Sequence, residues 1–313
     1  MCDKLSNMRE DVHQTDETNV SVRVGGAAML PAHPLLHAAE TALSALGRDA
    51  GGLSVVWFTS ERAILLQEEP VPSLYLKVYQ QAAQLEREVA TMERAAAAGI
   101  PVATRLAFHA DPPAVLITER VGGIPLASSY PLAAEETGRL LRRFHALGAR
   151  PPFVDGQSDW SAFIRSWANR EIATMVERRA IDPGDGQRLY RHFAASAVVL
   201  SARPCVLIHA DLQAEHVLID PITQQVTAFL DFVDTQPGDP LMDIAVLTLW
   251  ESELVALILD GYGAEGDEDV DLLPTYRLLR HLGAANWLVE HGVPAEAIRH
   301  EQAVRHYLSS PLL

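Results

Sequence analysis

The spacing of apolar residues changes near residue 122, and this change limits the folds that the chain can adopt. Before that point, three short segments rich in β-branched, aromatic and leucine residues lie at 53–58, 62–67 and 73–79. Such segments, separated by turn-compatible residues, are typical of antiparallel strands. After residue 122 the spacing is mostly helical, as at 132–147. The sequence therefore predicts an α+β fold with a small sheet-rich part and a larger helical part.

The sheet-rich part also contains two predicted helices, at 34–46 and 81–98. A glycine follows each helix, as is common where helices end. The second helix places four apolar side chains on one face: Leu85, Val89, Met92 and Ala96. Two further strands are predicted at 102–109 and 114–120, which brings the expected sheet to five strands.

The length of 313 residues fits two domains or lobes. Residues 1–20 are polar and mixed in charge, so we expect a frayed or disordered segment there. We expect an N-lobe at 21–121 and a C-lobe at 122–313. A cleft between two lobes is the usual place for a small ligand.

The charge of the chain excludes some partners. The 41 acidic residues outnumber the 25 basic ones, which gives a net charge of −16. This balance argues against binding to nucleic acid or to an anionic membrane surface, because both need clustered positive charge. It is compatible with a cationic small molecule. The two cysteines, Cys2 and Cys205, cannot form a disulfide framework, and no apolar stretch resembles a signal peptide or a membrane span, so we expect a cytoplasmic protein.

The segment 204–243 contains the most informative polar residues. An apolar strand leads to His209 and Asp211, His216 lies five residues after Asp211, and a second apolar strand ends at Asp231. Phosphoryl transfer needs a carboxylate that accepts the proton of the attacking hydroxyl, and ligands that hold a divalent metal against the phosphates. The two strand ends would supply both. Either segment alone is also compatible with a purely structural loop.

Together, these segments resemble the aminoglycoside and macrolide phosphotransferase family, which includes choline-kinase-like enzymes. The resemblance covers roughly residues 50–250. It is carried by His209-Ala210-Asp211, Leu230-Asp231-Phe232, and Gly238-Asp239-Pro240 with Asp243. It implies the two-lobed protein-kinase-like fold, with a nucleotide-binding N-lobe and a catalytic, acceptor-binding C-lobe.

By this resemblance, Asp211 is the catalytic base, and His216 and Asp231 are metal ligands. Two residues depart from the usual pattern. Ala210 stands where the family usually has Gly, and His216 replaces the Asn of many members, although macrolide phosphotransferase-like members often have His. Imidazole suits Mn²⁺ or Zn²⁺ better than Mg²⁺. We expect Mg²⁺ as the metal, and because of the histidine we expect Mn²⁺ to support comparable turnover.

The Gly238-Asp239-Pro240 sequence also predicts the start of a helix. Asp239 can cap a helix whose first residue is Pro240, since proline at that position loses no hydrogen bond. One turn later, Asp243 would face the catalytic loop and accept backbone hydrogen bonds from it. An acidic first turn that complements the helix dipole explains Asp243 equally well.

Lys77 is one of only two lysines among the 25 basic residues. It lies in a predicted strand, where an inward-pointing ammonium is costly unless it meets an anion such as a nucleotide phosphate. We expect Glu88, on the following helix, as its partner. Glu86 is the rival, but Arg87-Glu88 with Met92 matches the family's usual pattern. A surface lysine is the ordinary alternative.

Three further positions are expected to bind the nucleotide. The turn at 58–61 would cover the phosphates, with the Ser60 hydroxyl and backbone N–H groups as donors. Backbone groups of Glu119 and Val121, at the lobe junction, would bind the base. The sequence does not decide between ATP and GTP.

The acceptor is expected to be a cationic natural-product antibiotic, such as an aminoglycoside or a macrolide. The acidic segment 251–271 would attract such a molecule if it bordered the cleft, although a solvated loop explains it as well. Trp160 and Trp167 fit either an acceptor pocket or the core. A metabolite kinase of choline or fructosamine type, a metal-dependent phosphoester hydrolase that uses His209 as well, and a non-catalytic nucleotide-binding module remain alternatives. The sequence does not indicate an oligomeric state.

Overall fold

The structure is a computed structural model that describes residues 34–49, 51, 53–58, 62–69, 72–148, 159–263 and 271–310. Contacts divide the chain into two compact units. Unit 1 is Met1–Leu85 with Arg105–Arg120, and unit 2 is Glu86–Thr104 with Val121–Leu313. The polar segment 1–20 lies outside the described residues. The lobe boundaries expected from the sequence remain predictions.

Unit 1 is built on a five-stranded sheet with strand order β1-β2-β3-β5-β4. Its strands are β1 (Leu53–Phe58), β2 (Arg62–Gln67), β3 (Leu74–Tyr79), β4 (Arg105–His109) and β5 (Ala114–Glu119). Every neighbouring pair is antiparallel, as predicted. The fourth strand begins later than expected, because Val102 pairs instead with Phe229 in an isolated bridge.

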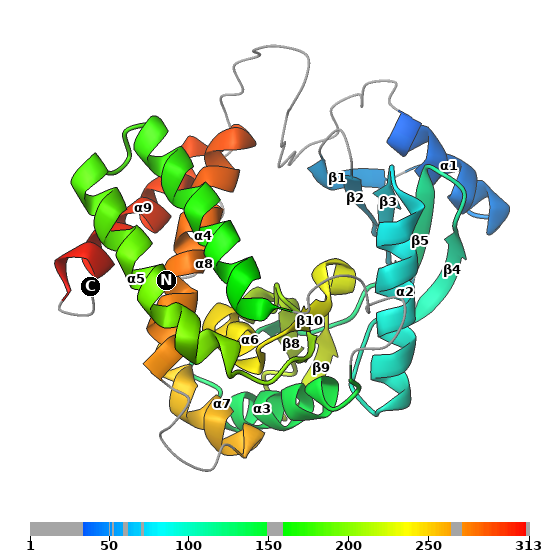
Figure 1. The fold of residues 1–313 in the computed structure, drawn as a ribbon. Coiled ribbons are helices and arrows are strands. Elements are labelled where there is room, and N and C mark those ends of the chain that lie inside the picture. Colours follow the sequence, from blue (N-terminus) through cyan, green and yellow to red (C-terminus); the bar gives the residue numbers. More distant parts are fainter. Residues whose placement is uncertain are drawn as a thin grey trace. The chain divides into compact units, whose positions relative to one another are not determined.

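Helix α1 (Pro34–Ala45) packs against β2, β3 and β5 and closes the core of unit 1 (Figure 1). This core includes Leu74, Leu76 and Val78 of β3, which alternate along the strand and are fully buried. Because successive side chains of a strand point to opposite faces, Lys77 projects from the face opposite α1. Gly47 ends the helical segment with φ +71°, a conformation that glycine adopts without strain.

Helix α2 (Ala82–Ala97) begins in unit 1, and most of its length belongs to unit 2. Leu85, Val89 and Met92 are buried on one face, as predicted. Ala96 is exposed, and Ala95 is buried in its place. Glu88 and Thr91 are buried as well, so the buried face near the end of the helix is centred closer to Ala95 than to Ala96.

Unit 2 is mostly helical. Its helices are α3 (Pro131–His145), α4 (Trp160–Glu177), α5 (Pro183–Ser201), α6 (Pro240–Leu247), α7 (Leu254–Tyr262), α8 (Leu273–Glu290) and α9 (Pro294–Ser309). Helix α8 packs against α4, α6 and α9, while α3 packs against α7 (Figure 1). No helix in the part of the chain that the structure describes is both long and apolar enough to cross a membrane.

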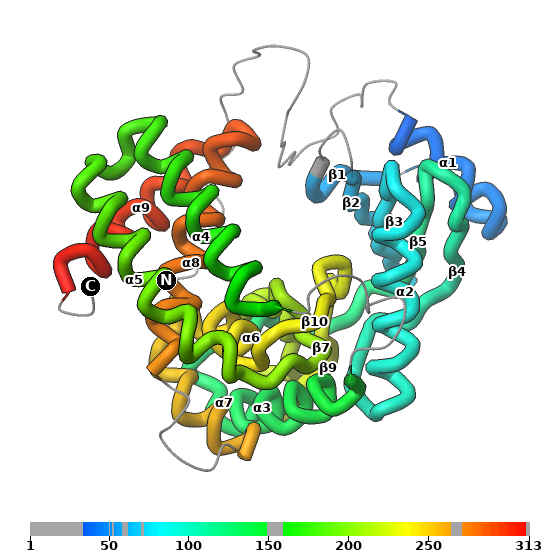
Figure 2. The backbone as a smooth tube through the Cα atoms, in the orientation of Figure 1, coloured from blue at the N-terminus to red at the C-terminus, as the bar shows by residue number. Residues whose placement is uncertain are grey.

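Short strands in unit 2 are followed by the loops that contain the predicted site residues Asp211 and Asp231. One ribbon pairs β7 (Val206–Ile208) with β10 (Gln236–Gly238), and a second sheet has the order β6 (Ile124–Pro125), β8 (Val217–Ile219), β9 (Val226–Phe229). Two 3-10 turns, η2 (Ala214–His216) and η3 (Phe232–Asp234), follow the loops after β7 and β9. Figure 2 shows this part of the backbone, in yellow-green, beside helix α6.

Candidate active site

Unit 2 brings three of the sequence-predicted residues to two adjoining loops. Asp211 follows β7, His216 ends η2, and Asp231 follows β9. The amide N–H of Leu230 donates to the carbonyl oxygen of His216 at 2.9 Å, so the chain holds Asp231 next to the His216 turn. Asp231 has φ +63°, a left-handed conformation that is uncommon for a residue other than glycine and recurs at functional sites.

The carboxylate of Asp211 is about one-fifth exposed, and its two oxygens have different surroundings. Oδ1 binds the guanidinium of Arg280 and lies 3.4 Å from Nε2 of Gln213. Oδ2 lies 3.9 Å from Nδ1 of His216, beyond hydrogen-bonding distance. Within the described residues, Oδ2 therefore remains open to an acceptor hydroxyl.

The ring of His216 is oriented by the backbone of Asp211. Nδ1 lies 2.7 Å from the Asp211 carbonyl oxygen, which only accepts hydrogen bonds. Nδ1 therefore carries the hydrogen, and in the neutral ring Nε2 carries the lone pair. This is the arrangement found in metal-binding histidines, whose second nitrogen donates to a carbonyl or carboxylate.

Asp243 stabilises the loop that follows β7 and carries Asp211. Its fully buried carboxylate accepts hydrogen bonds from the backbone N–H groups of His209 and Ala210, both at 2.7 Å. These bonds confirm the predicted bracing role of Asp243. They also compensate for Ala210, which adopts φ +68°, where a side chain costs about 1–2 kcal/mol relative to glycine.

Asp243 has a third partner that the sequence did not reveal. Nε2 of His145 lies 3.0 Å from Oδ2 of Asp243, and Nδ1 of the same ring lies 2.7 Å from the Tyr262 hydroxyl. Burial, reinforced by Asp243, raises the pKa of Tyr262 to about 12, so the phenol keeps its proton and can donate to Nδ1. The Nε2 hydrogen is then directed to Asp243. No local motif marks His145 or Tyr262, because their partners lie 98 and 117 residues away.

His209 has a structural role. It is fully buried, and Nε2 donates to the Leu230 carbonyl at 2.9 Å, which joins the two loops. Its ring packs on Phe232, with centroids 4.9 Å apart. Burial lowers the pKa of His209, so the ring is neutral at physiological pH. Its Nδ1 is buried, and no group of metal-binding side chains forms around it within the described residues, which argues against the hydrolase alternative.

The donor set fits a divalent metal that also binds phosphates. No three His, Cys, Asp or Glu side chains within the described ranges form a group that could hold a metal ion by themselves. Mg²⁺ in phosphoryl-transfer sites takes few protein ligands, because phosphate oxygens and water complete its shell. Nε2 of His216 and the carboxylate of Asp231 fit this requirement.

The residues predicted to bind nucleotide are distributed over both units. Lys77 and Glu119 lie in strands β3 and β5 of unit 1, while Glu88 and Val121 belong to unit 2. Glu88 is 1% exposed whereas the rival Glu86 is exposed, which matches the preference for Glu88. Ser60 lies outside the described residues. The roles of all five in nucleotide binding remain predictions.

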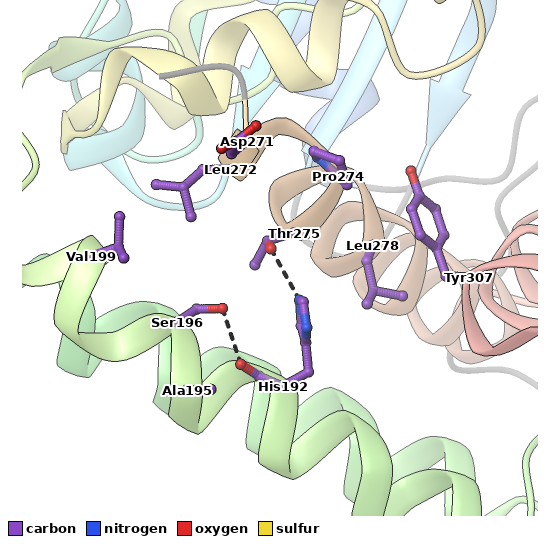
Figure 3. Close-up of a pocket in the computed structure, with 10 residues that line it drawn as sticks. All are labelled: His192, Ala195, Ser196, Val199, Asp271, Leu272, Pro274, Thr275, Leu278 and Tyr307. Atoms are coloured by element: carbon purple, nitrogen blue, oxygen red, sulfur yellow. Dashed lines mark hydrogen bonds between the residues drawn. The ribbon is translucent and has the colours of Figure 1, made fainter. Parts of the chain in front are cut away.

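A cavity of about 320 Å³ lies elsewhere in unit 2, between α5, α8 and α9 (Figure 3). Its polar lining includes His192, whose Nε2 lies 3.0 Å from the Thr275 hydroxyl. None of the predicted site residues lines it. Trp160 is buried and donates to Tyr276, while Trp167 is half-buried beside Arg280, the residue that binds Asp211.

Comparisons with known proteins identify the family of the chain. The model of the Phosphotransferase enzyme family matches residues 57–282, more than half of the chain. No curated protein sequence matches the chain at a significant level.

Several solved structures share the fold. The chain is 26% identical to aminoglycoside phosphotransferase APH(3'')-Id from Streptomyces rimosus, with a TM-score of 0.58 over 79% of this chain and 98% of that one. A thermostable mutant of aminoglycoside phosphotransferase APH(4)-Ia, in a ternary complex with ADP and hygromycin B, gives 17% identity and a TM-score of 0.65 over 87% and 97%. Macrolide 2'-phosphotransferase MphH from Brachybacterium faecium gives 18% and 0.60 over 88% and 98%. The five-stranded sheet followed by a mostly helical part is thus a kinase-like fold, as predicted.

Proposed function

Because the chain belongs to the phosphotransferase enzyme family, we propose that it transfers the γ-phosphoryl group of ATP or GTP to a hydroxyl of a small molecule. One observation carries the proposal: the Asp211 carboxylate is held through Oδ1, while Oδ2 is open. A carboxylate in this state can orient a hydroxyl and accept its proton.

The two loops also supply the remaining protein groups of the transfer. Nε2 of His216 and the carboxylate of Asp231 would hold Mg²⁺ or Mn²⁺. When bound, the metal neutralises charge on the phosphates. Asp243 fixes the backbone of the loop that carries Asp211, so that the base keeps one position. Nucleotide binding is assigned to a separate set of residues: Ser60, Lys77, Glu88, Glu119 and Val121.

For the acceptor, we propose a cationic antibiotic of the aminoglycoside or macrolide class, so that the reaction would confer resistance. The net charge of −16 supports a cationic partner, and similar solved structures hold gentamicin, streptomycin or hygromycin B. The acidic segment 251–271 supports it less: the Glu251 carboxylate already accepts the backbone N–H of Ser128, and residues 264–270 lie outside the described residues.

The first experiment replaces the base. Asp211→Asn keeps the shape but removes the proton acceptor, and we expect transfer to fall by about 10²–10⁴-fold. Nucleotide binding, measured by calorimetry, should be retained. Asp220→Asn, in an exposed turn of the same segment, makes the same charge change and should leave turnover unaltered.

The acceptor panel should contain aminoglycosides, macrolides and small amino alcohols, each tested with ATP and with GTP in a coupled assay. Transfer to none of them, with nucleotide still stabilising the protein against heat, would favour a non-catalytic binding module. Phosphate release from an ester without nucleotide would favour a hydrolase. Unchanged turnover in Asp211→Asn would overturn the assignment of the base.

A further inference from the structure

Arg280 of helix α8 brings a permanent positive charge to the candidate base. It lies 69 residues after Asp211 in the chain, and its guanidinium binds Oδ1 of Asp211. Its side chain is only about one-fifth exposed, and the guanidinium carbon lies 6.0 Å from the centre of the Trp167 ring. Arginine does not lose its proton in proteins, so this charge is present at every working pH.

The contact leaves the base able to work. Arg280 and Gln213 both approach Oδ1, whereas Oδ2 has no hydrogen bond among the described residues. An acceptor hydroxyl can therefore bind Oδ2 while Arg280 stays in place. The ion pair fixes the direction in which the free oxygen points, which is what a general base requires.

Arg280 is the charged residue of helix α8 that contacts Asp211. Between Leu273 and Val289, α8 contains Arg277, Arg280 and His281 and no acidic residue. Burial lowers the pKa of His281 to about 3, with smaller contributions from His300 and nearby arginines. His281 is therefore uncharged, and Arg277 binds Thr248. The positive charge that α8 places beside Asp211 is thus that of Arg280.

An ammonium group next to the reacting hydroxyl would face the guanidinium of Arg280. Like charges brought together in a partly buried site oppose binding strongly. Arg280 binds Asp211 through Nη2, and the N–H groups of a guanidinium can donate to an oxygen but cannot accept from an ammonium. Both observations favour an acceptor with oxygen groups at this point, whatever charges it carries further away.

We propose that Arg280 positions Asp211 and selects acceptors whose reactive hydroxyl is flanked by oxygen groups and not by an amine. This proposal rests on the proposed phosphotransferase function and narrows its acceptor class. A cationic antibiotic satisfies it only if its amines lie away from the hydroxyl that reacts.

The test compares acceptors that differ in one group. Kanamycin A and kanamycin B differ by a hydroxyl or an amine beside one sugar hydroxyl, and glucose and glucosamine form a smaller pair. We expect the hydroxyl member of a pair to have at least about tenfold higher kcat/KM in the wild-type enzyme. Arg280→Met should reduce this preference to within about threefold, through a lower KM for the amine member.

The positioning role of Arg280 and its role in acceptor selection should affect different kinetic constants. Arg280→Met should also lower kcat for both members by roughly a hundredfold, because the base is no longer held. Arg280→Lys keeps the charge and should keep the preference while recovering only part of kcat. Arg277→Met, on the same helix but bonded to Thr248, removes an equal charge and should leave the preference unchanged.

Two outcomes would overturn the role of Arg280: a wild-type enzyme that prefers the amine member, or an Arg280→Met enzyme with the wild-type preference. A fall in thermal stability with equal losses for both members would show a merely structural role. In each of these cases phosphoryl transfer still occurs. Absence of transfer to any acceptor contradicts instead the proposed function, so the two failures are distinguishable.

Discussion

Two buried carboxylates, one turn apart on helix α6, are stabilised in different ways. Asp239 and Asp243 are both fully buried. Asp239 binds the guanidinium of Arg203 at 2.7 and 3.1 Å, the Tyr276 hydroxyl at 2.7 Å and the backbone N–H of Leu241 at 3.0 Å. Among the described residues, Asp243 contacts no arginine: its partners there are two backbone N–H groups and the His145 ring.

Because their partners differ, we assign the two carboxylates different roles. Asp239 caps α6, as predicted, and connects it to Arg203 at the end of α5 and to Tyr276 on α8. Burial and the adjacent Asp239 raise the pKa of Tyr276, so its phenol remains a donor. Asp243 connects α6 to the loop that carries Asp211. The first carboxylate therefore joins helices, whereas the second fixes the loop that carries the proposed base.

The largest effect is expected from breaking the Asp239 pair. Asp239→Ala leaves Arg203 buried without its partner, which should lower the free energy of unfolding by about 3–5 kcal/mol. Urea denaturation measures this. Arg203→Met combined with Asp239→Leu should recover most of the loss, because an apolar pair needs no charge compensation. A loss below about 1 kcal/mol in the single variant would refute the anchoring role.

The next effect concerns Asp243 and appears in turnover. Asp243→Asn replaces one acceptor oxygen by a donor that opposes the N–H groups of His209 and Ala210. We expect kcat to fall at least about a hundredfold, since small displacements of a catalytic group have effects of that size. Stability should fall by only about 1–3 kcal/mol. If Asp239→Asn lowered kcat as much at equal stability, the contrast between the carboxylates would not hold.

The smallest effect is a pH dependence of stability, which arises from His209, a backbone partner of Asp243. Burial lowers the pKa of His209, so the folded protein keeps this ring neutral while the unfolded chain takes up a proton below about pH 6.5. Stability is then complete above that pH and decreases as the pH falls, by at most about 1.4 kcal/mol per unit for one histidine. Asp239 is paired with Arg203, which does not titrate in this pH range.

Urea denaturation between pH 7.5 and 5.5 measures this dependence. His209→Gln should make it shallower, while His306→Gln, at an exposed position on α9, should leave it unchanged. Buried His281 and half-buried His300, with pKa values lowered to about 3 and about 4, add to the slope in the same direction in every variant. A wild-type stability that stays constant over this range would contradict the assignment of His209 as a buried neutral ring.

The sequence predicted what depends on neighbours in the chain. Alternating burial in β3 and the cap formed by Asp239 both arise within a few residues, so periodicity and residue type were sufficient. Arg280 and His145 could not be found in this way, because they reach Asp211 and Asp243 from helices 69 and 98 residues distant. Their contacts depend on how helices pack, which apolar spacing does not determine.

Ala210 gives the catalytic loop a property that glycine would not provide. Glycine visits left- and right-handed backbone conformations with similar ease, whereas alanine strongly prefers the right-handed one. The left-handed shape of Ala210 therefore persists only while Asp243 holds the two adjacent N–H groups. Because of one methyl group, the shape of this loop thus depends on a single buried carboxylate.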